Sequence, residues 1–258
     1  MCSAAARYSR TGRGQGLSGY PVLELPPLYD GRILRRYKRF LADVELPGKG
    51  VVTAHCPNTG SMQGCWEPGA PAQLSASDNP KRKLGWTLER VDMGAGWVGV
   101  NTSRVNQIIR GAFEHRLVSD LEHYGSIRPE PKYDVAEHGR SRFDFLLQSE
   151  SSPDCYVEVK NTTLLRDGRI EFPDAVTTRG RKHLQLLQHA VARGCRGIIL
   201  FAVNRPEGDT FSVARDIDPD YHAELLRSID RGVEAIALRL KHEADRVVPA
   251  ETLPLDLG

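Results

Sequence analysis

The sequence predicts an α+β protein with two domains, in which a small β-barrel or sandwich precedes an α/β domain with a mixed sheet. Two changes of pattern along the chain predict this division. In residues 21–100 the apolar residues come in short runs separated by Gly, Pro and Asn, which is typical of short strands joined by tight turns. From residue 103 they recur at helical spacing, and helical and strand-like segments then alternate. With 258 residues, of which 40% are hydrophobic, the chain is large enough for both cores.

The domain boundaries follow from the same patterns. We expect a tail over residues 1–20, a barrel domain over 21–100, an α/β domain over 101–245 and a C-terminal tail over 246–258. The first segment is rich in Arg, Gly and Ser and has no apolar stretch of signal-peptide length. We therefore predict that it is disordered and is not a targeting segment.

The first domain contains five predicted strands, over residues 37–46, 51–54, 70–77, 84–91 and 98–100. In the first of them alternate residues are apolar, so one face is expected to point to the core, with Phe40, Ala42, Val44 and Leu46. The residues between them are expected to face solvent, namely Arg39, Asp43 and Glu45.

The second domain begins with a helix, predicted over residues 103–121, where Val105, Ile108, Ile109, Ala112 and Phe113 recur on one face. The later elements are strands near 126–133, 142–147 and 155–160, a helix over 178–193, a strand over 198–203, a helix over 219–231 and a strand over 233–240. Residues 198–203 (IILFAV) are continuously apolar, as expected of a strand buried on both faces. If this strand and 155–160 share a sheet in parallel, the crossover between them is expected to be right-handed.

Two of these strands carry charged residues in a pattern that indicates a site. The seven residues 148–154 join strands 142–147 (RFDFLL) and 155–160 (CYVEVK), so an antiparallel pair is the natural arrangement. The apolar residues are then expected to share one face, namely Phe143, Phe145 and Leu147 with Cys155, Val157 and Val159. Asp144, Glu158 and Lys160 lie on the other face, with Asp144 directly opposite Glu158 if the loop is symmetric.

Two opposed carboxylates repel each other and destabilise a sheet unless a cation lies between them. Mg²⁺ or Mn²⁺ held by Asp144 and Glu158 would resolve the repulsion, because hard cations prefer oxygen ligands. Such an ion polarises a phosphoryl oxygen and activates water. Lys160 would orient that water or stabilise charge on the phosphate, so all three residues are candidate catalytic residues. The alternative is that Glu158 and Lys160 only make an exposed strand soluble.

Two groups of basic residues are candidates for DNA-phosphate contacts. Arg179, Lys182 and His183 lie near the start of the helix predicted over 178–193, where anions bind readily. In the first domain the basic residues are interleaved with Tyr37, Phe40 and Trp86, which suits stacking on bases. These residues are Arg36, Lys38, Arg39, Lys81, Arg82 and Lys83. Ordinary solvated surface charge is the alternative for both groups.

The composition excludes several classes of protein. No run of about 18 apolar residues is present, so we expect no membrane span. The net charge of +2 means that any basic surface is local. The five cysteines are scattered and form no C-x-x-C pair, which argues against a structural zinc site. They are expected to be reduced thiols in a cytoplasmic protein.

Several segments together resemble the sugar fermentation stimulation protein A family. They are Arg36–Asp43 (RYKRFLAD), Ala54–Met62 (AHCPNTGSM), Ser77–Leu84 (SDNPKRKL), Val98–Thr102 (VGVNT), Ser141–Leu147 (SRFDFLL), Cys155–Asn161 (CYVEVKN) and Phe172–Leu184 (FPDAVTTRGRKHL). The resemblance implies an OB-like barrel followed by a domain of the PD-(D/E)xK nuclease type, whose motif would be Asp144, Glu158 and Lys160. It also implies DNA binding and a link to the regulation of sugar-utilisation genes. The chain departs from the family pattern at Gly111, where many members have a Glu, and Glu114 is the remaining acidic candidate on that helix.

Three hypotheses follow for function. The first is a DNA-binding protein with a nuclease-type metal site, linked to regulation of sugar metabolism. The second is an active Mg²⁺- or Mn²⁺-dependent DNA nuclease. The third is a small-molecule or partner-binding protein in which the carboxylate pair is structural. The sequence leaves open whether the protein forms a homodimer.

Overall fold

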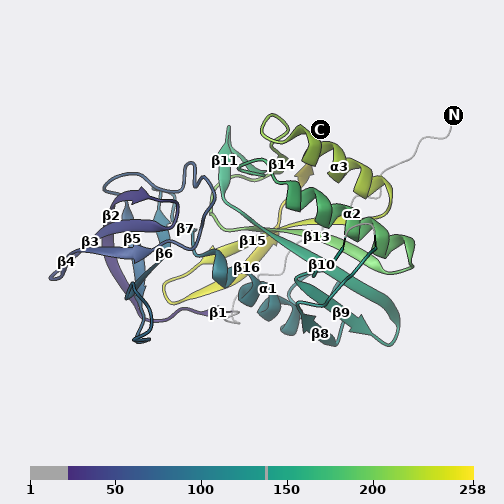
Figure 1. The fold of residues 1–258 in the computed structure, drawn as a ribbon, viewed down its shortest axis with the longest axis horizontal. Helices are drawn as coiled ribbons and strands as arrows, with labels where there is room; N and C mark the ends of the chain where they lie inside the picture. The colour runs from purple at the N-terminus through teal and green to yellow at the C-terminus, as the bar shows by residue number, and fades with distance from the viewer. Residues whose placement is uncertain (1–22, 137–138) are drawn as a thin grey trace.

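The computed structural model describes residues 23–136 and 139–258, so the segment 1–20 that was predicted to be a tail lies outside the described residues. Two domains lie side by side, a barrel at the left of Figure 1 and a larger sheet domain at the right. This arrangement confirms the predicted two-domain α+β fold.

The first domain is a closed five-stranded barrel. Its strands are β2 (Leu28–Tyr37), β3 (Leu41–Leu46), β4 (Gly50–His55), β5 (Pro71–Ala76) and β6 (Trp86–Asp92), with β7 (Trp97–Gly99) added beside β6. Neighbouring strands pair in the order β4-β3-β2-β5-β6, and a parallel pairing of β4 with β6 closes the ring. Five closed strands are the architecture of an OB-like barrel.

The chain turns between β2 and β3 where a single strand, 37–46, was predicted. Lys38 and Arg39 have positive φ angles of 50° and 66°, so the chain reverses there. Ala42, Val44 and Leu46 are buried, as predicted. Phe40 is 45% exposed, because it belongs to the turn and not to the alternation of the strand, and its prediction as a core residue was wrong. Asp43, expected to face solvent, is buried beside β2 and forms an ion pair with Arg35.

The second domain is built on a seven-stranded mixed sheet. Its strands, in spatial order, are β1 (Leu23–Glu24), β16 (Arg246–Thr252), β15 (Glu234–His242), β13 (Arg196–Val203), β10 (Ser152–Thr162), β9 (Phe145–Ser149) and β8 (Ser126–Pro129). The three central strands, β10, β13 and β15, are parallel, and the outer pairings are antiparallel. The parallel pairing of β10 with β13 meets the condition under which a right-handed crossover between residues 155–160 and 198–203 was expected.

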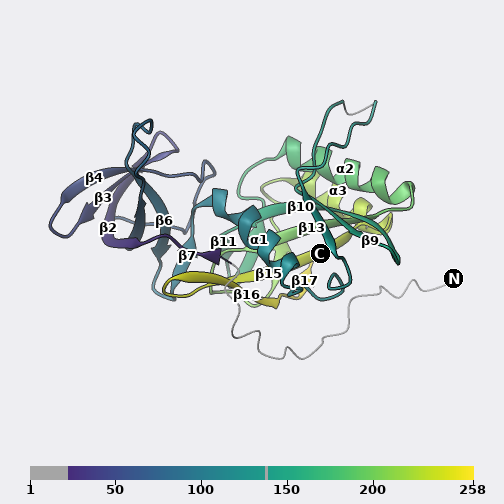
Figure 2. The same ribbon diagram turned by 90° about the horizontal axis from the view of Figure 1, so that it is seen from below.

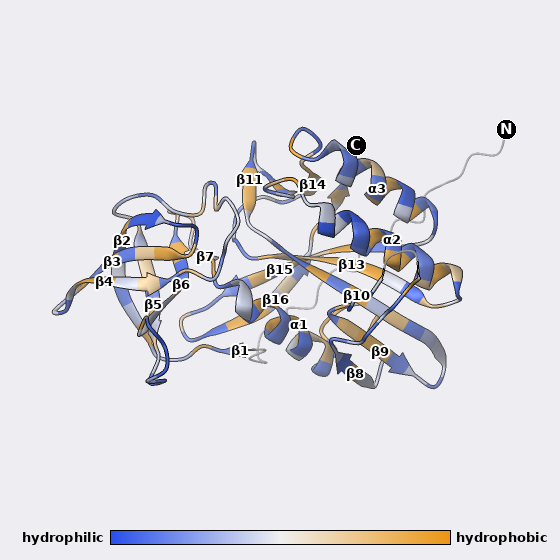
Figure 3. Cartoon of the chain, in the orientation of Figure 1, coloured by the Kyte–Doolittle hydropathy of each residue, from blue (hydrophilic) through white to orange (hydrophobic). Residues whose placement is uncertain are grey.

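Helices cover both faces of this sheet. The short 3-10 helix η1 (Thr102–Arg104) leads into α1 (Val105–Glu114), which covers one face. Helices α2 (Thr178–Ala192) and α3 (Pro219–Asp230) cover the other face (Figure 1). Alternate residues of β13 enter the two cores, Leu200 on the α1 side and Phe201 on the α2 side. Figure 3 shows that apolar residues concentrate on these central strands, as expected of strands buried on both faces.

The helix starts follow capping chemistry that the sequence carries. Thr177 accepts a hydrogen bond from the N–H of Gly180 at 3.0 Å, and Asp218 accepts one from Tyr221 at 2.9 Å. Both helices lie within one residue of their predicted ranges. Helix α1 ends at Glu114, although 103–121 was predicted to be helical, because the chain turns at Arg116, whose φ is 57°. None of the helices in the described part of the chain is long and apolar enough to cross a membrane.

The C-terminal residues differ from the predicted tail over 246–258. They form β16 in the large sheet and β17 (Leu255–Asp256) in a second, four-stranded sheet, and they bury Val247 and Leu257. The other strands of the second sheet are β11 (Leu164–Arg166), β12 (Arg169–Phe172) and β14 (Phe211–Val213). The apolar residues of 247–257 therefore complete the second domain.

A buried arginine joins the two domains. In Figure 1 and Figure 2 the β15–β16 hairpin extends from the sheet domain toward the barrel. Arg90 of β6, only 1% exposed, donates to the carbonyl oxygens of Glu243 at 2.5 Å and Ala244 at 2.7 Å in the turn of that hairpin. It also donates to Gln73 Oε1 at 2.5 Å. Burial lowers the pKa of Arg90, although nearby carboxylates oppose the effect.

His242 lies at the same junction and gives it a predicted pH dependence. Burial, reinforced by the charge of Arg90, lowers the pKa of His242 to about 3. Its Nε2 lies 3.0 Å from Asn204 Oδ1, and its Nδ1 has no hydrogen-bond partner in the part of the chain that the structure describes. Between its ordinary pKa of about 6.5 and the lowered value, the unfolded chain therefore binds a proton that the folded chain does not bind.

We expect His242→Gln to flatten the loss of stability in acid. In the parent protein His242 contributes a fall in unfolding free energy of about 1.4 kcal/mol per pH unit as the pH drops below its ordinary pKa. The variant keeps a donor for Asn204 but does not titrate. Urea unfolding at pH 7, 6 and 5 checks this, and equal slopes for the two proteins would contradict it.

Candidate functional site

The candidate acidic pair, Asp144 and Glu158, lies at the point where the pairing of β9 with β10 ends. Their antiparallel ladder ends with Phe145 opposite Val157, and one further step in the same register places Asp144 opposite Glu158. Residues 142–144 turn away from β10 toward residues 130–131, and the N–H of Phe143 donates to Pro131 O at 3.2 Å. Because the chain leaves the strand here, Phe143 packs in the core under α2 and not with Phe145. The prediction that these two side chains share a face was wrong.

Asp144 replaces the missing strand partner of β10. Its Oδ2 accepts the N–H of Val159 at 2.7 Å, and its Oδ1 accepts from Asn106 Nδ2 of α1 at 2.7 Å. Burial raises the pKa of Asp144, and the negative charge of Glu158 raises it further. The two hydrogen bonds lower the pKa of Asp144 and only partly offset these effects. Desolvation and repulsion by Glu158 therefore both disfavour the charged form of this carboxyl group.

Glu158 lies in the middle of β10 and faces α2. It is 4% exposed, and Lys160 Nζ lies 2.6 Å from its Oε1. The same oxygen contacts Nδ1 of His183, which is 5% exposed. Burial opposes ionisation of Glu158, but the hydrogen bond from His183 and the charge of Lys160 outweigh it and lower the pKa of Glu158. The surroundings therefore raise the pKa of Asp144 and lower the pKa of Glu158.

The structure brings Asp144, Glu158 and Lys160 together and adds two residues. Asn106 was not predicted, since an exposed Asn on a helix gives no sequence signal. His183 was predicted as a phosphate contact, and it lies buried against Glu158. Both residues fix a carboxylate of the pair from a helix, one on each face of the sheet.

Helix α1 does not bring Glu114 to the pair. Glu114 forms an ion pair with Arg110 at 2.8 Å and is about half exposed. It lies two turns beyond Asn106, about 12 Å along the helix axis, and Gly111 has no side chain to offer. Among the described residues no group of three or more His, Cys, Asp or Glu is arranged to hold a metal ion. Any ion at this site would complete its shell with other oxygens.

A basic cavity of about 620 Å³ adjoins the pair through His183. One wall is the start of α2, with Arg179 and Lys182, and the other is the chain before β9. Its lining residues are Lys132, Asp134, Arg140, Ser141, Arg142, Arg179, Lys182 and His183. Lys132, Arg140 and Arg142 were not predicted as site residues. The strands expected near 126–133 and 142–147 end at Pro129 and begin at Phe145, so Lys132 and Arg142 lie in irregular chain with Arg140. We call this the basic cavity.

Aromatic contacts hold the two walls together. The hydroxyl of Tyr133 lies 2.9 Å from Nδ1 of His189 on α2. The ring of Tyr133 packs against Phe143 and Tyr156, with centroids 5.1 Å and 4.8 Å away. The chain around Tyr133 is thereby packed against α2, and the cations before β9 lie across the cavity from those of α2.

The predicted basic residues of the barrel are placed differently from one another. Arg36 is occupied by the carbonyl oxygens of Asn58 and Gly60, at 2.9 Å and 2.8 Å, and Arg39 donates to Thr59 O at 2.9 Å. These bonds shape the loop 57–62. The loop reaches the second domain, where Ser61 donates its N–H and hydroxyl to Asp174 Oδ2, each at 2.9 Å.

The remaining barrel cations are exposed: Lys38 in the β2–β3 turn, and Lys81, Arg82 and Lys83 between β5 and β6. Arg82 also donates to Thr87 Oγ1 at 2.9 Å. DNA contact by this group stays a prediction.

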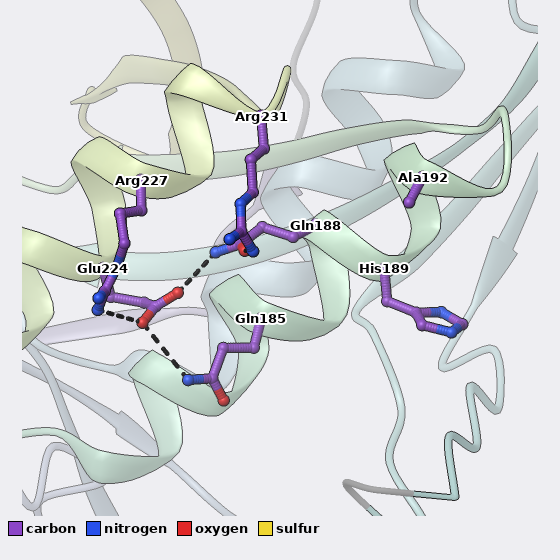
Figure 4. Close-up of a pocket in the computed structure, with 7 residues that line it drawn as sticks. All are labelled: Gln185, Gln188, His189, Ala192, Glu224, Arg227 and Arg231. Atoms are coloured by element: carbon purple, nitrogen blue, oxygen red, sulfur yellow. Dashed lines mark hydrogen bonds and ion pairs between the residues drawn. The ribbon is translucent and has the colours of Figure 1, made fainter.

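A larger cavity, about 800 Å³, lies between α2 and α3 (Figure 4). Its polar groups are bonded to one another. Gln188 Nε2 donates to Glu224 Oε1 at 2.6 Å, and Arg231 donates to Gln188 Oε1 at 2.6 Å. None of the acidic pair or Lys160 lines it, so its size does not make it the candidate site.

The closed OB-type barrel and the helix-covered mixed sheet define a two-domain α+β protein. Residues 34–100 match the family described as the SfsA N-terminal OB domain, and residues 103–246 match the Sugar fermentation stimulation protein RE domain. The chain belongs to the sugar fermentation stimulation protein family.

Relatives of known name support this assignment. The sugar fermentation stimulation protein homolog of Geobacter metallireducens is 48% identical over 236 residues, covering 91% of this chain and 100% of the relative. That of Geobacter sulfurreducens is 46% identical over 232 residues, covering 90% and 97%. The solved structure of Pyrococcus furiosus SfsA in complex with Ca²⁺ superposes with a TM-score of 0.82 at 24% identity, over 92% of this chain and 100% of that one.

Proposed function

We propose that the protein binds DNA and hydrolyses phosphodiester bonds with Mg²⁺ or Mn²⁺ held by Asp144 and Glu158. The observation that carries the proposal is a pair of carboxylates on neighbouring chain segments, the half-buried Asp144 just before β9 and the buried Glu158 on β10, in which Glu158 raises the pKa of Asp144. Retaining two acids in this position costs stability unless a cation compensates them.

The donor atoms at the pair fit a hard divalent cation. The hydrogen bonds from Lys160 and His183 both go to Oε1 of Glu158, which leaves Oε2 available. A strand residue directs its C=O to the same edge as its N–H, so the carbonyl of Val159 offers a further oxygen beside Asp144. Mg²⁺ is commonly held by one or two carboxylates with water and substrate phosphate completing the shell. The Ca²⁺ in the P. furiosus protein is also an ion that takes oxygen ligands.

The residues around the pair have separate tasks in this proposal. A bound cation would supply Lewis acidity toward a phosphoryl oxygen and favour deprotonation of water. Asn106 and the Val159 N–H orient Asp144, and His183 orients Glu158. Lys160 places a positive charge where negative charge develops on the phosphate. The basic cavity next to His183 attracts the nucleic-acid backbone.

The barrel supports DNA as the substrate. OB-folds bind single-stranded nucleic acids through a basic groove and aromatic side chains. The contact between Ser61 and Asp174 places a barrel loop beside the segment that leads into α2. The proposed link to sugar metabolism rests on the family name and not on any residue of the site.

A second candidate is DNA binding without cleavage. Two observations support this second candidate. Lys160 and His183 already occupy Oε1 of Glu158, and the described residues supply no third acidic or histidine ligand. In that case the acid pair would serve binding or regulation.

The deciding experiment incubates the protein with plasmid, single-stranded DNA and RNA in Mg²⁺, Mn²⁺, Ca²⁺ or EDTA. We expect cleavage of DNA in Mg²⁺ or Mn²⁺ and none in EDTA, together with DNA binding that weakens as salt rises. Binding without cleavage in any metal would favour the second candidate. Neither binding nor cleavage would leave a small molecule or a protein partner as the ligand.

A further inference from the structure

The basic cavity carries more positive charge than its surroundings neutralise. Lys132, Arg140, Arg142, Arg179 and Lys182 face one carboxylate, Asp134, which also accepts the N–H of Ser141 at 3.1 Å. Arg142 reaches only Glu130, at 3.4 Å, and both side chains are largely exposed. The other four cations form no side-chain hydrogen bond or ion pair with any described residue. Cations gathered without partners repel one another, so an anion in the cavity would be stabilised.

Two walls that are distant in sequence build the cavity. Arg179 and Lys182 lie on the first turns of α2, whose N-terminal end carries a partial positive charge. The opposite wall is held in place by the bond between Tyr133 and His189. Cations on two opposite walls suit an anion that is contacted from several sides.

The charge and shape of the cavity favour a phosphate at a strand end over a phosphate within the strand. A phosphodiester carries one negative charge, whereas a phosphomonoester carries about 1.5 to 2 at neutral pH and has three strong acceptor oxygens. The four cations without a partner among the described residues, against the single lining carboxylate of Asp134, match the more highly charged group. The volume of about 620 Å³ is also in the range of a small-ligand site and is enough for a terminal nucleotide.

We propose that the basic cavity binds the phosphomonoester at the end of a nucleic-acid strand. The proposal rests on the proposed function, because it takes nucleic acid as the substrate. His183 lines the cavity and contacts Glu158, so a strand end held there lies one side chain away from the acid pair. The protein would then act near strand ends.

The test measures binding in EDTA, so that no cleavage is needed. Fluorescence anisotropy compares one oligonucleotide with a 5′-phosphate, a 3′-phosphate or hydroxyl ends, and a circular single strand competes for binding. Calorimetry with inorganic phosphate measures whether the cavity binds a phosphate group that is not attached to a nucleic-acid strand. The variants are Arg179→Ala and Lys182→Ala. The matched control is Arg193→Ala, an exposed arginine just beyond the other end of α2, about 20 Å along the helix.

We expect one phosphorylated end to bind about tenfold more tightly than the hydroxyl end, since hydrogen bonds to charged groups are strong. This preference should disappear in Arg179→Ala and Lys182→Ala and persist in Arg193→Ala. Arg179 and Lys182 make no ion pair, so all three variants should keep the parent melting temperature.

Three other outcomes would overturn the proposal. Equal affinity for phosphorylated, hydroxyl-ended and circular strands would show that the cavity does not select ends, while cleavage would still decide the proposed function. Binding of inorganic phosphate that the variants lose, without any end preference, would make free phosphate the ligand. Absence of all nucleic-acid binding would overturn the proposed function together with this inference.

Discussion

Glu158→Gln is expected to lower metal-dependent cleavage of DNA by at least about 100-fold, because the substitution removes a charged oxygen ligand and the activation of water that depends on it. Gln keeps an oxygen that can accept from Lys160 and His183, so the side chain should stay in place. The measurement is the rate of cleavage of a labelled oligonucleotide in Mn²⁺.

A second readout separates loss of metal from loss of fold. An ion present at 100 times its dissociation constant stabilises the folded state by about 2.7 kcal/mol, so Mn²⁺ should raise the melting temperature of the parent protein but not of Glu158→Gln. Glu224→Gln is the matched control, since Glu224 is also buried and ion-paired, with Arg227 at 2.8 Å, but lies on α3. Full activity in Glu158→Gln, or equal loss in the control, would exclude the acid pair as the centre.

Arg90→Ala is expected to lower the free energy of unfolding by about 3–5 kcal/mol, because removing a buried charged donor leaves its acceptors unpaired. The carbonyl oxygens of Glu243 and Ala244, in the turn of the β15–β16 hairpin, would lose a bond each. Denaturant unfolding followed by tryptophan fluorescence and by far-UV circular dichroism measures the loss.

The control for this substitution is Arg32→Ala. Arg32 is an exposed barrel arginine with a single hydrogen bond to Gly69 O at 2.8 Å, so we expect little change in stability. We also expect the two spectroscopic transitions of Arg90→Ala to separate, since the barrel and the sheet domain lose their buried connection. Coincident transitions at parental stability would mean that other contacts hold the domains together.

The elements that the sequence predicts well are those with a strong local period. Strand β13 appears as a continuous apolar run, and its two faces do enter two cores. Helices α2 and α3 also carry their own caps, Thr177 and Asp218. Such signals lie within a few residues of the element that they define, so they need no knowledge of tertiary packing.

The errors arise where distant parts of the chain decide the outcome. The alternation in residues 37–46 continues through a turn in which Lys38 and Arg39, neither of them Gly, take positive φ. Phe143 leaves the face of Phe145 because it pairs with Pro131 instead of β10. The strands within residues 246–258 pair with β1 near the start of the chain and with β14 more than 40 residues earlier, as well as with the neighbouring β15, so the local pattern alone did not indicate them.

The candidate site likewise contains residues that local sequence pattern predicts and residues that only tertiary packing brings in. Two-residue alternation in β10 places Glu158 and Lys160 on one face, and the register of the β9–β10 hairpin places Asp144 next to Glu158. Asn106 is 38 residues from Asp144 and His183 is 25 residues from Glu158, and only the packing of α1 and α2 on opposite faces makes them neighbours. The basic cavity likewise depends on an irregular segment that is fixed by Tyr133.

The pairing of β1 with β16 has a consequence for how the protein is made. Leu23 lies opposite Val247, so the large sheet joins the beginning of its chain to a strand that leaves the ribosome some 220 residues later. The barrel strands lie between these two partners and can close during translation, whereas the sheet domain has to wait for almost the whole polypeptide. Truncation after residue 245 should therefore yield a folded barrel attached to an aggregation-prone remainder.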